Sequence, residues 1–357
     1  MISMTTTLEK KLKAMHEELL VEQPRTRERV ASTAKERKPR LMTQSPFFAI
    51  VNKEIADHVR SWRFNVMIAL LGLTCLGSLY TAVTNMTAGG SKDEAEGAFL
   101  FLKLFTMTDG TLPSFTVFIS FLGPLLGIAL GFDAINSEQN RGTLSRLMAQ
   151  PVHRDYIINA KALAALIVVS VMFLALSLMV MGIGLIRIGI LPTVEEFMRI
   201  LCFVGVSIVY VAFWLNLSIL FSVRFRQPAT AALSGISVWL FFTIFYQLLV
   251  NVVARVSAPS PMARPEEVLQ FQQFIQTLLG IVPSQLFSDA TTTLLMPSVR
   301  SLGPLTMTQM VGTIPSPLPL GQSLLLVWPQ VTGLIAATLV CFALAYVSFM
   351  RKEIRPR

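Results

Sequence analysis

Charged residues are scarce in this sequence. Asp, Glu, Lys and Arg make up 14% of its 357 residues, while hydrophobic residues make up 53%. An ordinary soluble domain has about 25% charged residues. The composition therefore places the chain among integral membrane proteins.

Cysteine and histidine are also rare, with three of each. Each cysteine falls within a different apolar run, which excludes a disulfide framework and indicates small buried hydrophobic side chains. No histidine has a second His or Cys at a metal-ligand spacing, so we expect no metal site. The six residues are Cys75, Cys202, Cys341, His16, His58 and His153.

The phosphate-binding motif GxxxxGK[ST] is absent, so we expect that the chain alone binds no cofactor and hydrolyses no ATP. No acidic or basic residue lies in the middle of a predicted transmembrane segment. Ion-coupled carriers usually keep such a group at membrane depth, at a cost of at least about 2.5–3.5 kcal/mol, because it carries the ion or proton. This absence disfavours an ion-coupled carrier.

Six segments are long and apolar enough to cross a bilayer, which takes about 20 residues. A seventh uncharged window, 268–288, contains five Gln and one Pro. Because an unpartnered amide is costly in hydrocarbon, we interpret this window as interfacial or re-entrant. We therefore predict an all-α integral membrane protein with transmembrane helices near 64–84, 115–132, 162–186, 200–223, 229–252 and 325–349.

The basic residues indicate an orientation. With six spans, the side that holds the N-terminal segment, the loop 133–161 and the C-terminal tail carries 23 of the 30 Lys and Arg residues. The positive-inside rule then places both termini in the cytoplasm of a multi-pass cell (inner) membrane protein. We attribute the net charge of +9 to this orientation and to membrane lipid, not to nucleic acid.

Residues 1–45 are predicted to form a cytoplasmic N-terminal extension. Residues 7–22 place apolar side chains on one helical stripe, which fits a partner-docking helix or a solvated terminal helix. Residues 23–44 are polar and aperiodic, so we predict a flexible linker. No signal peptide precedes the first span, and we expect that span to act as its own insertion signal. The membrane domain is predicted to occupy residues 46–353.

The stretch SPFFAIVNKEIADHVRSWRF predicts an amphipathic helix before the first span. Its apolar residues recur at steps of three and four, and its charged residues fall mostly on the other side. We expect this helix to lie in the cytoplasmic membrane interface and to turn into the membrane at Phe64. The charged residues are Lys53, Glu54, Asp57 and Arg60.

Three glycines, Gly123, Gly127 and Gly131, recur every four residues in the second predicted span. Their spacing gives one smooth face that another helix can approach closely. The partner is either another helix of the same chain or a second copy in a dimer.

Two long segments, 85–114 and 254–324, are expected on the outer side. The second is rich in proline and too long to lack structure throughout. We predict short helices at 265–280 and 284–296, which cap the outer mouth or receive an external partner.

The loop between the second and third spans, GFDAINSEQNRGTLSRLMAQPVHRDYIINAK, holds most of the chemistry-capable residues. Asp133 ends the second span, and Glu138 lies on the polar helical turns that follow, with both side chains expected to face the cytoplasm. Gly142 is suited to ending these turns. Thr143 is suited to capping the short helix that comes next.

That short helix, TLSRLMAQ, carries an apolar edge that includes Leu144 and Leu147. Pro151 stops it, and the chain returns to the third span with Arg154 and Lys161 at the level of the lipid headgroups. We interpret the result as a rigid amphipathic helix held between two membrane helices.

These residues resemble the cytoplasmic loop of ABC type-2 transporter permeases. The shared pattern is D-A-I-x-x-E-x-x-x-G-T-L-x-x-L-x-x-x-P-x-x-R-x-x-x-I-x-x-K. The stretch KEIADHVRSWRF is similar to the segment before the first span in those permeases. The resemblance covers about 47–353 and is greatest to the branch that serves nitrous oxide reductase maturation, in which VPSQLFSDA also has a counterpart. The loop positions that match are Asp133, Ala134, Ile135, Glu138, Gly142, Thr143, Leu144, Leu147, Pro151, Arg154, Ile158 and Lys161.

The resemblance implies a permease subunit that forms a homodimer and binds two separate ATPase subunits, which hold ATP and Mg. The loop would be the coupling helix in a groove of the ATPase. Glu138 and Arg146 would pair with ATPase charges, while Leu144 and Leu147 would fill its apolar groove. The residues expected to serve ATPase coupling are Asp133, Glu138, Gly142, Thr143, Leu144, Arg146, Leu147, Pro151, Arg154 and Lys161.

Three hypotheses follow for function. The first is the permease subunit of an ABC exporter, or a variant that moves an extracytoplasmic partner without passing a substrate. The second is an ATP-independent carrier or channel, and the third is a membrane scaffold for another enzyme. The cargo does not follow from the sequence.

Overall fold

The computed structural model describes residues 46–88, 99–108, 112–144, 153–260, 264–297 and 318–352, with Lys13, Met15 and Ala149. The chain divides into two units, 1–45 and 46–357, and the fold below is that of the second. The helix and linker predicted before residue 45 lie outside the described residues, apart from Lys13 and Met15, which are helical.

Six helical segments are long and apolar enough to cross a membrane, so the predicted all-α fold with six spans is confirmed. Within the described residues there is no strand. The fifth span continues from α10 through the π-helical turn η2 into α11. The spans are α3 (Trp62–Ala88), α5 (Phe115–Gly131), α8 (Arg154–Ile188), α9 (Val194–Arg224), α10 (Pro228–Leu240) with η2 (Phe241–Phe245) and α11 (Tyr246–Val256), and α15 (Leu320–Arg351).

The third span begins at Arg154, well before the predicted start near 162. The predicted boundary lies where the charged residues end. The charged residues in this first part of α8 find partners within the chain, as described below, and Ile157 and Ile158 are buried. The helix therefore continues through them.

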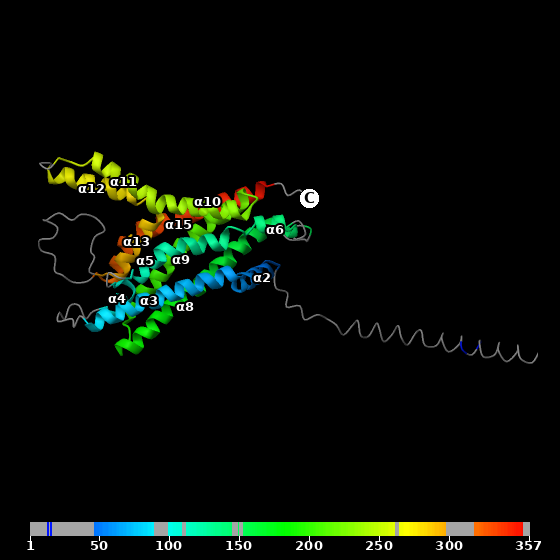
Figure 1. Cartoon of the computed structure of the whole chain (residues 1–357), viewed down its shortest axis with the longest axis horizontal. Coiled ribbons are helices and arrows are strands. Elements are labelled where there is room, and N and C mark those ends of the chain that lie inside the picture. The colour runs from blue at the N-terminus through cyan, green and yellow to red at the C-terminus, as the bar shows by residue number, and fades with distance from the viewer. Residues whose placement is uncertain are drawn as a thin grey trace, which may run out of the picture. The chain divides into compact units, whose positions relative to one another are not determined.

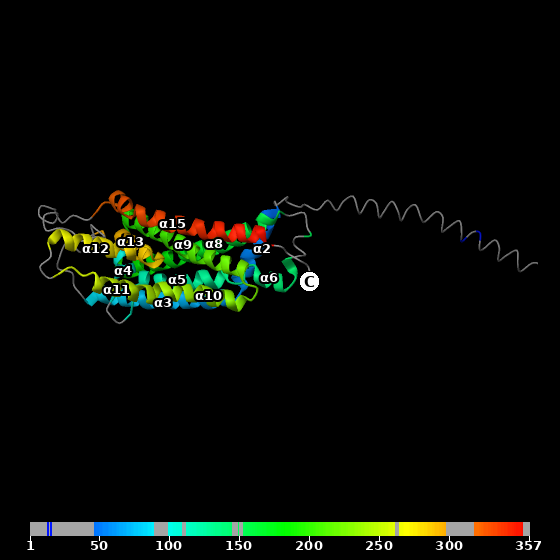
Figure 2. The same ribbon diagram turned by 90° about the horizontal axis from the view of Figure 1, so that it is seen from above.

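The short helices gather at the two ends of the bundle (Figures 1 and 2). At one end, here called the α2 end, lie α2 (Pro46–Arg60), α6 (Asn136–Asn140) and the last turn of α15. At the other, called the α13 end, lie α4 (Leu100–Thr106), α12 (Pro265–Leu279) and α13 (Pro283–Leu295).

Helix α9 is the centre of the bundle and contacts α5, α8, α10, α13 and α15. Its start is set by a capping box, in which Thr193 and Glu196 each accept a hydrogen bond from the other's main-chain N–H. Phe203, Tyr210 and Trp214 are fully buried along its length. Helix α9 is thus buried along most of its length, as the core helix of a bundle requires, and it exposes large apolar residues in its first turns, Phe197, Met198 and Leu201.

The glycine face of α5 packs against α9 of the same chain. A Cβ atom built on Gly127 would lie 2.8 Å from the carbonyl oxygen of Val211, and one on Gly131 would lie 2.7 Å from that of Leu215. Only glycine permits this approach of two backbones. The sequence left open whether this face packs against a helix of the same chain or against a second copy. The structure shows that it packs against a helix of the same chain.

A proline in α5 adds a second link to α9. Pro124 has no N–H, so the carbonyl oxygen of Ser120, four residues earlier, loses its helical donor. The hydroxyl of Tyr210 donates to that carbonyl at 2.8 Å. The freed acceptor is thus satisfied without water, as the membrane interior requires.

At the α13 end, α12 and α13 confirm the two short helices predicted after the fifth span. Helix α13 is largely buried, and its Phe287 stacks on Tyr210 of α9 with ring centroids 4.5 Å apart. Helix α4 was not predicted, because its sequence LFLKLFT is too short for periodicity to be read. It is nevertheless a buried element of the core.

A buried arginine holds the α13 end together. Arg199, in the second turn of α9, is fully buried and lies just outside the predicted fourth span. Its guanidinium donates to Glu195 of the same helix at 2.9 Å. It also donates to the carbonyl of Leu294 at the end of α13 and to the hydroxyl of Ser323 in α15. The planar fork of donors explains how one side chain joins three helices.

We expect Gly127→Ala to destabilise the protein, since the added methyl must displace backbone atoms of α9. The expected loss is about 1–3 kcal/mol, measured as a lower thermal midpoint of the purified chain in detergent. Gly205→Ala, in α9, is the matched control because nothing lies within 4 Å of its added Cβ. A midpoint for Gly127→Ala at or above that of Gly205→Ala would contradict the packing.

Candidate functional site: a charged cavity at the α2 end

Helix α2 is anchored to α8 by its narrow buried face. Pro46 is its first residue, a position where the missing N–H is not needed. Val51 packs against Ala160 and Ala164 of α8. Glu54 is buried on the same face, which corrects the prediction that it lies on the solvated side. Lys53, Asp57 and Arg60 are exposed, as the amphipathic pattern predicted.

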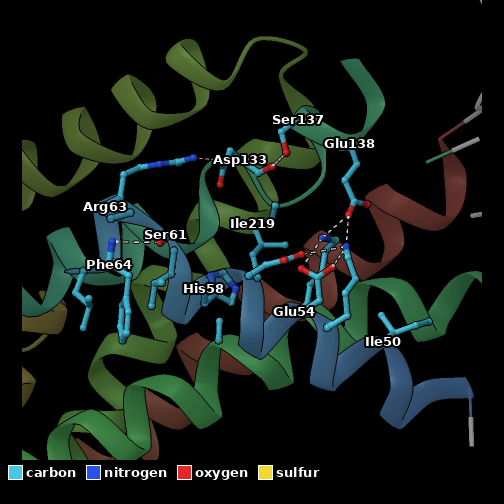
Figure 3. A pocket seen from close by; sticks show the side chains of 18 of the residues that line it. Ile50, Glu54, His58, Ser61, Arg63, Phe64, Asp133, Ser137, Glu138 and Ile219 are labelled. Carbon is cyan, nitrogen blue, oxygen red and sulfur yellow. Dashed lines mark hydrogen bonds and ion pairs between the residues drawn. The ribbon is translucent and has the colours of Figure 1, made fainter. Parts of the chain in front are cut away.

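An ion cluster lies between α2, α6 and α8 (Figure 3). The ammonium of Lys161 donates to Glu54 Oε2 and to Glu138 Oε1, both at 2.9 Å. Lys53 lies 2.9 Å from Glu54 Oε1 and 3.6 Å from Glu138 Oε1. Asp57 extends the cluster, 3.4 Å from Lys53. We call Lys53, Glu54, Asp57, Glu138 and Lys161 the Lys161 cluster.

The centre of the Lys161 cluster is shielded from solvent. The side chains of Lys161 and Glu54 are 6% and 8% exposed, and that of Glu138 is 16% exposed. Breaking such a pair by removing one partner leaves an uncompensated buried charge, which is far more costly than losing a surface ion pair. The cluster therefore fixes α2, α6 and α8 relative to one another.

Burial alone would raise the pKa of Glu54, but the charge and hydrogen bonds of Lys161 and Lys53 outweigh it and lower that pKa. Burial would lower the pKa of Lys53, and the neighbouring carboxylates raise it instead. When folding lowers the pKa of a carboxyl, that carboxyl stabilises the folded protein at pH values above the pKa it has in the unfolded chain. This stabilisation is lost as the pH falls through the pKa of the folded protein. Glu54 and Lys53 are therefore both charged at neutral pH.

The cluster corrects two predictions about the loop. Glu138 was expected to face outward and meet a partner protein, and it is instead held by Lys161 and Lys53. Lys161 was expected at the level of the lipid headgroups, and it is buried between helices. Sequence spacing shows charges on a helix but not the carboxylates that approach from helices distant in sequence.

Asp133 is also paired within the chain. Its carboxylate lies 2.7 Å from the guanidinium of Arg63 at the start of α3, and Arg63 lies over the ring of Phe132 at 4.9 Å. Arg63 was not selected as a site residue from the sequence, although it lies within the interfacial stretch SPFFAIVNKEIADHVRSWRF. Figure 3 shows this pair beside the Lys161 cluster.

Helix α6 is tied to α9 by main-chain and side-chain hydrogen bonds. The N–H groups of Ile135 and Asn136 both donate to the hydroxyl of Ser222, at 3.0 and 3.3 Å. Asn140 donates to the carbonyl of Arg226 in the turn after α9. The polar turns after the second span are thus fastened to the central helix.

The end of α6 differs in part from the prediction. Gly142 has a φ of +69°, the left-handed conformation suited to ending a helix. The hydroxyl of Thr143 donates back to the carbonyl of Glu138 at 3.2 Å and so helps to close α6. Thr143 and Leu144 are helical, and the rest of the short helix predicted to follow Thr143 lies outside the described residues, except Ala149. Leu144 is 2% exposed and belongs to the core of this chain, so it does not line an outward-facing apolar edge.

The remaining loop predictions divide into two groups. Arg146, Leu147 and Pro151 lie outside the described residues. Arg154 does not reach toward lipid headgroups but donates to the carbonyl of Lys352 at 2.8 Å. Lys352 in turn donates to the carbonyl of Val223 at the end of α9. The start of α8 and the end of α15 are thereby joined beside α9.

A cavity of about 650 Å³ lies next to the two ion-pair groups, among α2, α3, α5, α6, α8 and α9. Its lining includes the Lys161 cluster, Arg63, Asp133, Arg141 and His58. Burial lowers the pKa of His58, so its imidazole is uncharged at neutral pH. In the described part of the chain, no group of three or more His, Cys, Asp or Glu side chains is arranged to hold a metal ion.

The six spans and the tethered loop can be compared with known proteins. The family model described as "ABC-2 family transporter protein" matches residues 48–354, which is nearly the whole chain. The chain belongs to the ABC-2 transporter family. It is therefore a transmembrane permease subunit of an ABC transporter, and membership implies an ATPase partner.

Two curated relatives share this family. The chain is similar to "Probable ABC transporter permease protein NosY" of Pseudomonas aeruginosa, with 28% identity over 208 residues that cover 56% of this chain and 68% of the relative. It is also similar to a protein of the same name from Stutzerimonas stutzeri, with 30% identity over 154 residues, 41% of this chain and 52% of the relative. ABC-2 permease subunits are generally non-catalytic.

Lys161→Met in this ABC-2 permease should lower the free energy of unfolding by about 3–5 kcal/mol, because Glu54 and Glu138 would stay buried without their shared cation. The measurement is denaturant-induced unfolding in detergent micelles, followed by tryptophan fluorescence.

Lys53→Met is the matched control for that experiment. Its side chain is 58% exposed, so its loss should cost at most about 1 kcal/mol. Adding Glu54→Gln to Lys161→Met should recover part of the stability. Equal losses in the free energy of unfolding for Lys161→Met and Lys53→Met would show that burial does not determine how much each lysine stabilises the protein.

Proposed function

We propose that this ABC-2 permease couples ATP hydrolysis by a separate ATPase subunit to export of a substrate, or to mechanical action on an extracytoplasmic partner. ATP and Mg are held by the ATPase. The observation that carries the proposal is the attachment of loop 133–161 to α2 and to the spans α8 and α9 by the Lys161 cluster and Ser222. A loop fixed in this way transmits force instead of yielding to it.

The contacts define a path along which that force travels. Pressure on the loop reaches α8 through the bond between Glu138 and Lys161, and it reaches α9 through Ser222. Helix α9 runs to the α13 end, where Arg199 joins it to α13 and α15. A rigid element with fixed contacts at both ends carries a displacement across the membrane.

The structure changes which loop residues are proposed to contact the ATPase. Glu138 and Leu144 face the permease itself and serve to hold the loop. The proposed contacts are therefore Arg146 and Leu147, with Pro151 ending the helix that carries them. Their chemistry, one charge beside one apolar side chain, suits a groove with a polar rim.

The proposed orientation places the α2 end in the cytoplasm, where the ATPase is found. Both ends of the membrane domain, the start of α2 and the end of α15, lie at this end of the bundle (Figure 2). Together with the basic residues in the adjacent segments, this arrangement fits the positive-inside rule for a cell (inner) membrane protein.

The fifth span supports a homodimer. In its most apolar window only 11% of the residues are buried, against 67% for α9. In α11 the exposed residues Gln247, Asn251 and Arg255 recur every four positions and form a polar stripe. Polar side chains are costly against lipid, so we propose that a second copy of the chain covers this stripe.

The first test is of ATPase coupling. We expect the purified permease to hydrolyse no ATP and to co-purify with a Walker-motif ATPase when the two are co-expressed. In the complex in proteoliposomes, Leu147→Asp should reduce ATP turnover at least tenfold, because a carboxylate would enter an apolar groove.

Gln272→Glu, an added charge on exposed α12 at the other end, is the control for that experiment and should leave turnover unchanged. Failure of any ATPase to co-purify would instead support an ATP-independent scaffold or carrier. Full turnover in Leu147→Asp would remove the coupling role of the loop.

The second test is of the dimer. In a background with Cys75, Cys202 and Cys341 changed to Ala, Asn251→Cys should form a disulfide-linked dimer in oxidised membranes. Leu178→Cys, on an exposed face of α8, is the control and should stay monomeric on a non-reducing gel. Cross-linking at Leu178 and not at Asn251 would place the dimer seam elsewhere.

A further inference from the structure

The cavity at the α2 end changes from polar to apolar at the same depth on each helix that forms it. On α3 the lining passes from Arg63 to Met67, at the end of α5 from Asp133 back to Leu130, and on α8 from Lys161 to Ala165. One turn of helix, about 5.4 Å, separates the two kinds of residue. The polar lining is nearest the α2 end, and the apolar lining is nearest the middle of the bundle.

This gradient matches the order of polarity in a membrane lipid. The amphipathic helix α2 covers the cavity at the level where headgroups lie. On the outer side of the same α3 turns, Val66 and Leu70 are exposed and face lipid. A cavity of about 650 Å³ is within the range of about 300–1,000 Å³ that holds small ligands.

Two lining groups, Glu138 within α6 and Arg141 at its C-cap, have hydrogen-bonding capacity that the described residues leave unused. Glu138 Oε2 is buried and has no hydrogen-bond partner there, since Lys161 and Lys53 occupy Oε1. Arg141 is exposed at the cavity and forms no ion pair with any residue that the structure describes. Three positions apart on a helix, the two side chains lie on the same side.

The unused groups have opposite charge, so a simple anion or cation satisfies only one of them. The whole lining contains as many basic as acidic side chains, four of each, and a ligand without net charge fits that balance. Such a ligand carries both a positive and a negative group. Its positive group must be an ammonium with N–H donors, because Glu138 Oε2 lacks a hydrogen bond. A quaternary ammonium has none.

We propose that the cavity binds the headgroup of a zwitterionic aminophospholipid, a phosphatidylethanolamine. Its primary ammonium donates to Glu138 Oε2, and its phosphate accepts from the Arg141 guanidinium. The acyl region lies against Met67, Leu126 and Leu130. Such a lipid fills the space between α2 and the spans and so holds the loop in place through Glu138.

The test uses the full chain, delipidated in detergent and titrated with short-chain phospholipids while native mass spectra are recorded. Phosphatidylethanolamine should bind about tenfold more tightly than phosphatidylcholine or phosphatidylglycerol, because only the first satisfies both groups. It should also raise the thermal midpoint more than the other two. Equal binding of the three lipids would overturn the proposal.

Arg141→Gln is the principal variant, because the exposed Arg141 side chain has no partner among the residues that the structure describes and folding should be unaffected. It should reduce phosphatidylethanolamine binding about tenfold. Glu138→Gln keeps the acceptor for Lys161 and should abolish the preference over phosphatidylcholine. Arg60→Gln is the matched control, because Arg60 is exposed on α2 and lies outside the cavity lining. It should retain both the affinity for phosphatidylethanolamine and the preference over phosphatidylcholine.

Soluble phosphoethanolamine distinguishes a lipid from a free headgroup. It should bind at least tenfold more weakly than the lipid, since the apolar lining contributes only with an acyl chain. Equal affinity would assign the site to a free phosphoamine and overturn the lipid source. Unchanged lipid selectivity in Arg141→Gln would remove the site from this cavity.

Discussion

The ammonium of Lys161 joins parts of the molecule that nothing in the sequence brings near one another. It belongs to the third span, yet its partners are Glu54 of the helix before the first span and Glu138 of the loop after the second. Because the charges are shielded from solvent, each depends on the others for compensation. The position of the loop, the packing of α2 on α8 and the shape of the cavity all depend on the pairing of these buried charges.

Helix α9 extends this constraint across the membrane. It is held by polar contacts at both ends, Ser222 at the α2 end and Arg199 at the α13 end, and by apolar packing between them. The glycines of α5 allow backbone contact along the middle, where side chains would keep the helices apart. The proposed transmission of force across the membrane uses this combination of polar contacts at the ends of α9 and close packing along its middle.

The burial of the spans separates two roles. Helices α5, α8 and α9 form the packed interior, while the fifth span remains largely uncovered. For a family of permeases, an uncovered span with a polar stripe is consistent with assembly around a second subunit. In the proposed function, the buried centre provides mechanical continuity within one chain, and the exposed span provides the contact between two chains.

Sequence alone determined the six spans, the two short helices after the fifth, the interfacial helix and the family resemblance. These depend on periodicity, length and local motifs, which act over a few turns of chain. Only the tertiary structure decided what the charged loop residues touch. Glu138 looked available to a partner because the two ammonium groups that hold it are distant in sequence: Lys53 lies 85 positions away and Lys161 lies 23 positions away. Leu144 looked like part of a docking edge for the same reason. Pairing between distant segments is set by the packing of α2 on α8, and no local pattern encodes it.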